Sequence, residues 1–292
     1  MDYRIADFLL RTEGPHSDIV ACGLHGFKPF EVESDTTAEP TMVLRMDSPI
    51  EEKEYPESKV LHTFDFEQNY ASGELSRYAT GYRFVMTREG KTFILVKENS
   101  SNIVESNLGC YDTADPSLVR FGIWIMFGIT IAPLGAIAIH SSVVVKDEGA
   151  VLCLGESGTG KSTHTRLWLN HIEGARLLND DSPIIRAIDG KAIVYGSPWS
   201  GKTHCYVNKC VPVRALMRLS QAPHNKIRRL PSLFAIGAIL PSCPPAFAYD
   251  STLQDHICNT VSDLLAVTPV YHLECLPDAA AAELSYSTIY EK

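Results

Sequence analysis

The stretch VLCLGESGTGKSTHTRLWL, Val151 to Leu169, decides how the second half of this chain is expected to fold. Four apolar residues run into a glycine-rich turn, and a helix-favouring segment follows the turn. Gly155 to Ser162 matches the pattern G-x-x-x-x-G-K-S/T in full. A strand before this pattern and a helix after it are the context in which the pattern holds phosphate. The stretch therefore predicts a strand, a phosphate-binding loop and a helix.

Each part of this loop has an expected role. Glycines let successive backbone N–H groups turn inward around an anion, and the helix N-terminus adds its positive dipole. Lys161 is expected to reach the terminal phosphates, and the Ser162 hydroxyl to ligate Mg²⁺. The residues expected to bind the nucleotide are Gly155, Glu156, Ser157, Gly158, Thr159, Gly160, Lys161, Ser162 and Thr163. The alternative is an ordinary glycine turn before a helix.

The composition is that of a globular protein that buries a core, with 292 residues, 45% hydrophobic and 21% charged. The formal net charge of −9 argues against binding nucleic acid or anionic lipid through bulk charge. Small molecules or proteins are therefore the expected partners. Eight scattered cysteines and an opening without a secretory signal favour reduced thiols in a cytoplasmic protein.

One segment is apolar enough to raise the question of a membrane. Phe121 to Ile139 carries no charge and is about long enough to cross a bilayer. The sequence APLG, Ala132 to Gly135, interrupts it. A buried helix, a turn and a buried strand are therefore preferred over a transmembrane span.

The chain is predicted to have two regions. Residues 1–115 are expected to be β-rich, because TMVLRM, KVLHTFDF, YRFVMTRE and KTFILVKE recur between turn signals. The last two runs flank Glu89-Gly90, which predicts a hairpin. The stretches ESDTTAEP and DSPIEEKEYPES are expected to be solvated loops.

Residues 116–292 have longer apolar segments, typical of an α/β domain with a mixed sheet. PIIRAI and KAIVYG are expected to form a hairpin about Asp189-Gly190. Further strands are predicted at AIAIHSSVVVK, GAVLCLG, ARLLND, VPVRALMRLS and VYHLECL, and helices at LPSLFAIGAIL and STLQDHICNTVSDLLAV.

Two adjacent carboxylates are the candidate reactive groups. Asp180 and Asp181 end a predicted strand nineteen residues after Lys161. One could hold a metal and the other accept a hydroxyl proton, provided that their strand lies beside the strand leading into the loop. The alternative is an aspartate pair that caps a turn before Ser182-Pro183.

His140 is a further candidate, fifteen residues before Gly155, where an apolar run becomes polar. A lone histidine is more often a structural residue than a functional one, so its context decides.

The order His140, GESGTGKS and NDD resembles the catalytic domain of HPr kinase/phosphorylase, whose phosphate-loop fold is shared with phosphoenolpyruvate carboxykinase. The resemblance covers Ile137 to Arg186 well and the rest of the C-terminal region loosely. The chain is also similar to HPr-kinase-like proteins found beside peptide-modification genes. In those proteins stretches like SPWSGK (197–202) and VPVRALMRLSQ (211–221) recur.

The resemblance implies roles for these residues and implies ATP and Mg²⁺ as cofactors. Asp180 would be the leading general base, and Asp181 would support the metal or the substrate, although the two could exchange roles. Ser162 and Asp181 would contact the metal, and His140 would tune or assist Asp180. The resemblance also implies a homo-oligomer.

Two departures from the family argue against HPr as the substrate. HPr kinases carry a glutamate where this chain has Thr163, and the family's glycine- and arginine-rich signature loop is missing. SPWSGK stands in roughly that part of the chain, so Trp199 and Lys202 are candidate substrate contacts, with a plain surface turn as the alternative. Arg228 and Arg229 in HNKIRRLP could grip an anion, or belong to a solvated basic turn.

Three functions are consistent with this sequence. The first is an ATP-dependent kinase that phosphorylates a hydroxyl, such as a serine of a protein or peptide, with Lys161 and a downstream arginine stabilising the charge that develops. The second is a carboxykinase-like enzyme acting on a small acid. The third is a non-catalytic nucleotide-binding regulator of peptide maturation. The acceptor, whether protein, peptide or small molecule, is not identified by the sequence.

Overall fold

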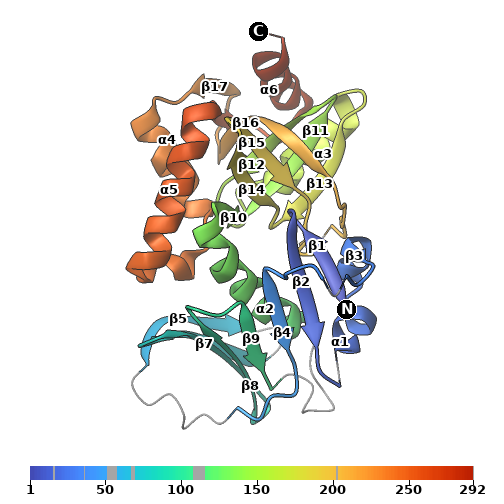
Figure 1. The fold of residues 1–292 in the computed structure, drawn as a ribbon. Helices are drawn as coiled ribbons and strands as arrows, with labels where there is room; N and C mark the ends of the chain where they lie inside the picture. Colours follow the sequence, from blue (N-terminus) through green and yellow to red (C-terminus); the bar gives the residue numbers. More distant parts are fainter. Residues whose placement is uncertain are drawn as a thin grey trace. The chain divides into compact units, whose positions relative to one another are not determined.

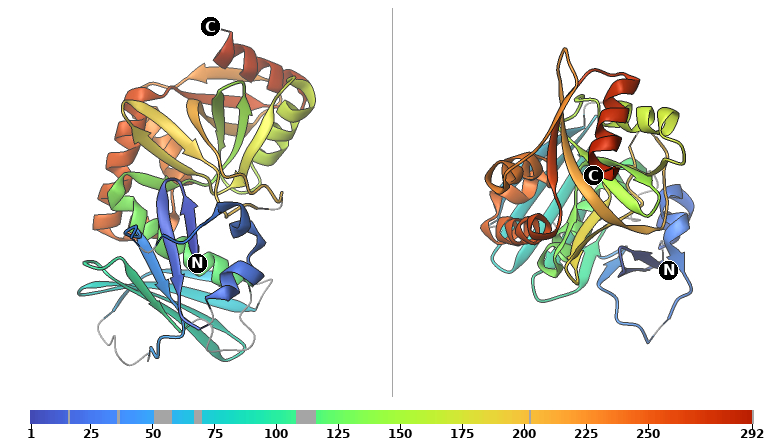
Figure 2. Two further views of the ribbon diagram at one scale, coloured as in Figure 1. Left: turned by 45° about the vertical axis from the view of Figure 1, so that its right-hand side comes forward. Right: turned by 90° about the horizontal axis from the view of Figure 1, so that it is seen from above.

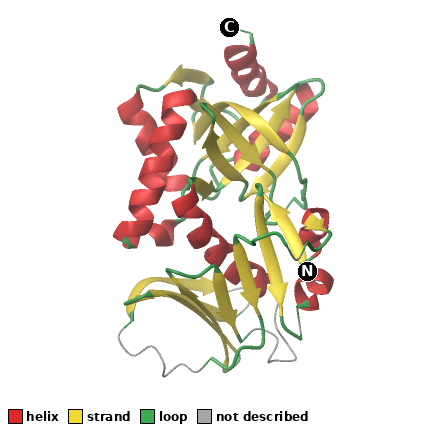
Figure 3. Cartoon of the chain, viewed as in Figure 1, coloured by secondary structure: helices red, strands yellow, loops and turns green. Residues whose placement is uncertain are grey.

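The computed structural model describes residues 1–15, 17–35, 37–50, 58–66, 70–107, 116–201 and 203–291. The chain forms two compact units, one of Met1–Leu134 with Ala246–Gln254 and one of Gly135–Pro245 with Asp255–Lys292. Both units combine helices with a large sheet, which confirms a mixed α/β fold (Figures 1 and 3). The division differs from the expected one after residue 115, because helix α2 (Pro116–Ile131) belongs to the first unit.

The first unit is built on a nine-stranded sheet in the order β3-β1-β2-β4-β9-β8-β7-β6-β5. The predicted β-rich character is confirmed, and Glu89 and Gly90 have φ values of 51° and 75°, as a two-residue hairpin turn requires. The strands are β1 (Asp2–Ile5), β2 (Phe8–Glu13), β3 (Glu31–Val32), β4 (Met42–Arg45), β5 (Lys59–Phe66), β6 (Ala71–Tyr78), β7 (Gly81–Arg88), β8 (Lys91–Glu98) and β9 (Ile103–Ser106). The short helices α1 (Asp18–Gly23) and η1 (His25–Phe30) follow β2.

Helix α2 packs closely against strands β7 and β8. A Cβ added at Gly122 would lie 3.0 Å from the Met86 side chain and 3.1 Å from that of Leu95, so glycine sets the closeness of this contact. Pro116–Leu134 is the one described helical segment long and apolar enough to cross a membrane, and 67% of its most apolar window is buried inside the protein. The expected succession of buried helix, turn and strand is present as α2, η4 (Ala132–Leu134) and β10 (Ala136–Ala138).

Residues 246–254 return to the first unit through a buried carboxylate. Asp250 is 4% exposed, pairs with Arg77 and accepts a hydrogen bond of 3.0 Å from the Tyr82 hydroxyl. These contacts hold the end of η6 (Pro245–Tyr249) and the beginning of α5 (Ser251–Val267) against β6 and β7.

The second unit has a nine-stranded mixed sheet in the order β10-β14-β15-β16-β12-β11-β13, extended by β18 beside β16 and by β17 beside β18. Asp189 and Gly190 form the predicted hairpin turn between β14 and β15, with φ values of 50° and 71°. The strands are β11 (Ser141–Lys146), β12 (Gly149–Leu154), β13 (Arg176–Asp181), β14 (Ile184–Ile188), β15 (Lys191–Tyr195), β16 (Cys210–Gln221), β17 (Lys226–Arg229) and β18 (Val270–Cys275).

Helices cover both faces of this sheet. Trp168 of α3 (Lys161–His171) and Ala282 of α6 (Ala279–Tyr290) share one core with Val151 and Met217 of the sheet. Helix α4 (Ser232–Ile239) lies on the opposite side from α3 and α6 (Figure 2).

Three local predictions need correction. AIAIHSSVVVK forms two strands, β10 and β11, with His140 between them, because β10 pairs with β14 whereas β11 pairs with β12 and β13. Lys226–Arg229 is a strand rather than a turn, because it pairs with β18. Helix α6 was not predicted, although Asp278 caps it by accepting a hydrogen bond from the backbone N–H of Ala281.

Candidate functional site

The glycine-rich loop, Gly155 to Ser162, connects β12 to α3 as the sequence predicted. Gly155, Gly158 and Gly160 have φ values of 150°, 82° and 102°. Residues other than glycine rarely adopt such positive values. A Cβ at Gly155 would also lie 2.5 Å from the Thr159 hydroxyl oxygen. Because the first N–H groups of a helix have no partner within the helix, this loop and the start of α3 together offer donors to an anion.

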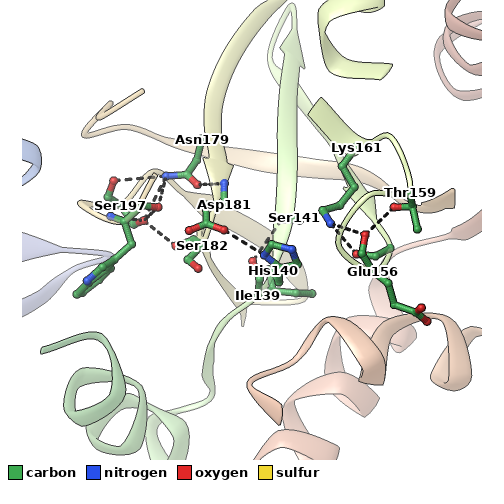
Figure 4. Close-up of polar contacts among 12 residues, drawn as sticks. Ile139, His140, Ser141, Glu156, Thr159, Lys161, Asn179, Asp181, Ser182 and Ser197 are labelled. Carbon is green, nitrogen blue, oxygen red and sulfur yellow. Dashed lines mark hydrogen bonds and ion pairs between the residues drawn. The ribbon is translucent and has the colours of Figure 1, made fainter. Parts of the chain in front are cut away.

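Lys161 folds back over the loop. Its Nζ donates hydrogen bonds of 2.7 Å to the carbonyl oxygen of Gly155 and 3.0 Å to that of Glu156 (Figure 4). Burial lowers the pKa of Lys161, while the nearby carboxylates of Asp181 and Asp180 act in the opposite direction. The lysine and the two aspartates therefore share one electrostatic environment.

The sheet brings the aspartate pair to the edge that carries the loop. Leu154, the last residue of β12, lies opposite Ser141 of β11, and Ser141 lies opposite Asp181 of β13. The expected adjacency of β12 and β13 is wrong, because β11 lies between them. Both strands nevertheless run antiparallel to β11, so their carboxyl ends meet at one edge, roughly 10 Å apart across two strand spacings.

The two aspartates face opposite sides of this sheet. In the next row, Asp180 lies opposite Ser142, whose hydroxyl is 2.9 Å from that of Thr165 on α3. Because side chains alternate along a strand, Asp180 faces the α3 side and Asp181 the other side. Asp180 is 8% exposed and its buried Oδ1 has no hydrogen-bond partner among the described residues. The Asp181 side chain is 36% exposed.

His140 contacts Asp181 rather than Asp180, the aspartate it was expected to assist. Its Nδ1 lies 3.1 Å from Asp181 Oδ1 (Figure 4). The backbone N–H of His140 donates a 2.7 Å hydrogen bond to the carbonyl oxygen of Ser242. The break between β10 and β11 thus positions the imidazole beside the more accessible carboxylate.

Residues 197–201 of the SPWSGK stretch contact the end of β13, which carries both aspartates. Asn179 Oδ1 accepts a 3.0 Å hydrogen bond from the Asp181 backbone N–H, and Asn179 Nδ2 donates to Ser197 Oγ at 3.2 Å. Ser200 pairs with Asp181 in an isolated β-bridge. Trp199 is 3% exposed, so its ring is buried rather than offered to a substrate. Lys202 lies outside the described residues.

Strand β16 supplies two contacts to the loop that the sequence analysis missed. Arg218 lies opposite Leu154, and its guanidinium is 3.1 Å from the Glu156 carboxylate. Gln221 donates a 3.2 Å hydrogen bond to the Gly158 carbonyl oxygen. Polar residues at 218, 220 and 221 after the apolar run of this strand were the available signal.

The predicted arginines Arg228 and Arg229 are not brought to the aspartate pair. They belong to β17, and strands β18 and β16 lie between β17 and β12. The Arg228 guanidinium contacts His272 Nδ1 at 3.3 Å, and Arg229 is exposed. Arg218, unlike these two, is placed at the loop by the fold.

A hollow of about 520 Å³ adjoins the loop at the start of α3. Its far wall comes from the ends of β16 and β18 and the turn after β18. The lining residues are Gly158, Thr159, Gly160, Thr163, His164, Leu167, Gln221, Ala222, Cys275, Leu276 and Pro277. The size is that of a small-molecule site.

The oxygen groups around the loop are suited to a metal shared with phosphate. No group of three or more His, Cys, Asp or Glu side chains among the described residues could hold a metal alone. The Ser162 hydroxyl and the Asp180 and Asp181 carboxylates are the hard oxygen ligands that Mg²⁺ prefers, and Mg²⁺ commonly takes only one or two protein ligands beside substrate phosphates.

Comparison with known proteins finds a distant likeness to solved structures. No protein-family model matches the sequence, and no curated protein matches it. The solved structure of the HPr(Ser) kinase/phosphatase from Coxiella burnetii aligns with 52% of this chain and 93% of its own, at 15% sequence identity and a TM-score of 0.29. At that TM-score the structural relationship is distant.

Proposed function

We propose that this protein is an ATP-dependent kinase that transfers a phosphoryl group to a hydroxyl of a protein, peptide or small molecule. The supporting observation is the row formed by Leu154, Ser141 and Asp181, which sets an accessible carboxylate at the same sheet edge as the glycine-rich loop. A loop alone fits any nucleotide-binding protein. The carboxylate beside it favours transfer to an acceptor.

The loop and α3 would hold the phosphates of ATP. Backbone N–H groups of Gly158 to Thr163 and the Lys161 ammonium would neutralise them. Ser162 and Asp180 would hold Mg²⁺, because Asp180 faces the α3 side and its Oδ1 lacks a partner among the described residues. Bound there, Mg²⁺ would neutralise charge that develops on the phosphates.

Asp181 would act on the acceptor. A general base must touch the hydroxyl that it deprotonates, and Asp181 is the more exposed carboxylate, held by His140. The acceptor oxygen attacks the terminal phosphorus as its proton passes to Asp181, the bond to the bridging oxygen breaks, and ADP leaves. Lys161 and Arg218 would stabilise the charge that develops.

Two conservative variants separate these roles. Purified protein would be incubated with cell lysate and γ-labelled ATP, and the labelled species identified by mass spectrometry. Asp181→Asn should lower transfer at least about a hundredfold with nucleotide affinity unchanged. Asp180→Asn should weaken binding of Mg²⁺ and ATP together, measured by calorimetric titration with and without Mg²⁺.

Asp189→Asn is the matched control, because asparagine tolerates the left-handed backbone of that hairpin position, φ 50°. It should leave both transfer and binding unchanged. Transfer by Asp181→Asn at the wild-type rate would remove the proposed mechanism. Tight ATP binding by the wild type without transfer to any acceptor would favour the nucleotide-binding regulator instead.

The cellular location and the oligomeric state can also be expected from this function. A cytoplasmic location is expected because ATP is the donor, and a homo-oligomer is expected from the resemblance to HPr kinases. Sedimentation of the purified chain measures the oligomeric state directly.

A further inference from the structure

Strand β17 directs its basic side chains to two different faces of the sheet. Ile227 packs against the core that α3 and α6 share with the sheet. Because side chains alternate along a strand, Arg229 faces the same side as Ile227. Lys226 and Arg228 face the opposite side, where α4 lies (Figure 2). Two cations of a chain whose net charge is −9 therefore lie on the α4 side.

The guanidinium of Arg228 is positioned by a histidine and not neutralised by an acid. Its Nη2 lies 3.3 Å from Nδ1 of His272, and Nε2 of that ring lies 2.9 Å from the Ser220 hydroxyl. Arginine can only donate, so Nδ1 carries a lone pair and the imidazole is neutral. Glu274 lies opposite Lys226, whereas Arg228 has no carboxylate partner among the described residues. Its charge and its remaining N–H groups are therefore available to a carboxylate.

The helix that follows β17 has an apolar outer surface. Leu233 of α4 is 79% exposed and Phe234 is 65% exposed, and the helix carries no charged residue. Exposed apolar side chains that lie together mark a contact surface. Leu233 follows Arg228 by five residues, so their backbones are at most about 17 Å apart. One partner segment can therefore contact the cation and the apolar pair together.

Arg228 also belongs to the row of residues that leads to Asp181. Strands β17, β18, β16, β12, β11 and β13 each contribute one residue to this row, namely Arg228, His272, Arg218, Leu154, Ser141 and Asp181. Five strand spacings separate the two ends of the row, roughly 24 Å. An extended chain covers this distance with about seven residues. A segment of a peptide or protein spans it, whereas a small molecule does not.

We propose that Arg228, Leu233 and Phe234 form a docking surface for the acceptor, which binds a peptide or protein segment that has carboxylates beside apolar residues. This inference rests on the proposed function and narrows its acceptor to a peptide or protein. The carboxylates pair with the guanidinium, and the apolar side chains cover Leu233 and Phe234. Because the surface is remote from the reacting atoms, docking raises the local concentration of the hydroxyl at Asp181. It should therefore lower KM and leave kcat unchanged.

The test uses synthetic peptides with one serine and the segment Asp-Asp-Leu-Phe, in both orders. Glycine–serine linkers of about two, eight or fourteen residues separate the two parts. Fluorescence anisotropy measures binding, and γ-labelled ATP measures transfer. The wild type should bind these peptides more tightly than peptides with Lys-Lys-Leu-Phe. In one of the two orders, KM should fall when the linker is long enough to join the docking surface to Asp181.

Three variants at exposed positions identify the contacts. Arg228→Glu should raise Kd and KM for the Asp-Asp peptides about tenfold, with kcat and ATP affinity unchanged. Arg229→Glu is the matched control, because it makes the same charge change one residue along the strand but on the other face, and should leave both values near those of the wild type. Phe234→Ser should weaken the binding of the Asp-Asp and Lys-Lys peptides alike. Thermal unfolding of each variant checks that it folds.

Several results would overturn the inference. These are equal affinity of the wild type for the two peptides, equal weakening by Arg228→Glu and Arg229→Glu, or a dimer that Phe234→Ser dissociates in sedimentation, because a second copy would then cover the surface. Transfer to the peptides without preference would leave the proposed function standing and remove the docking surface. The expected Kd values without transfer to any peptide or lysate protein would keep the surface and remove the kinase.

Discussion

Replacing His164, a buried residue of α3, should change how the free energy of unfolding of the second unit depends on pH. Burial lowers the pKa of His164 from 6.5 to about 4. Above pH 6.5 the ring is neutral in both the folded and unfolded chain. Between pH 6.5 and 4 the unfolded chain binds a proton that the folded chain does not, so the free energy of unfolding falls by about 1.4 kcal/mol per pH unit. The total loss is about 3 kcal/mol, and it is complete near pH 4.

His164→Gln cannot titrate, so its stability should fall less steeply over the same range. Urea unfolding at pH 7.5, 6.5, 5.5 and 4.5 gives the difference between wild type and variant. That difference should be constant above pH 6.5 and shrink by about 1.4 kcal/mol per unit below it. The matched control is His204→Gln, because His204 is an exposed histidine of the same unit. A pH-independent difference for His164→Gln would refute a neutral, buried ring.

Three further substitutions test the loop, the Arg218 contact with it and the packing of the first unit. Gly155→Ala forces a side chain into φ 150°, at a cost of about 1–3 kcal/mol, and should weaken Mg²⁺·ATP binding in a titration; unchanged affinity would contradict the loop geometry. Arg218→Ala should lower turnover about a hundredfold while the free energy of unfolding changes by less than about 1 kcal/mol, and its control Arg176→Ala, at the exposed start of β13, should leave turnover unchanged. Gly122→Val overpacks α2 against Leu95, so the first unit should lose about 1–3 kcal/mol in thermal unfolding, with ATP affinity intact.

The parts of the site that follow from local pattern could be predicted from the sequence. The loop could be predicted because its glycines stand at fixed spacings in one short stretch, where the backbone takes positive φ angles. The strand before the loop and the helix after it follow from apolar periodicity. Asp180 and Asp181 could be predicted because one helix and one strand follow the loop, and the two carboxylates stand at the end of that strand. These features depend on residues close together in the chain.

The remaining features depend on strand pairing between distant segments. No local pattern indicates that β11 lies between β12 and β13. Because of this pairing, His140, just before β11, contacts Asp181 rather than Asp180. Arg218 reaches the loop only because β16 pairs with β12. Trp199 resembled a substrate contact because its flanking Pro198 and Gly201 signal an exposed turn, whereas its segment is buried against Asn179.

The most direct test of the proposed kinase site is a crystal structure with Mg²⁺ and a non-hydrolysable ATP analogue. We expect the phosphates inside the turn of Gly155 to Ser162, Lys161 at the terminal phosphate, and the Asp181 carboxylate close enough to share an acceptor hydroxyl with that phosphate. A nucleotide bound elsewhere, or a carboxylate pair turned away from the terminal phosphate, would contradict it.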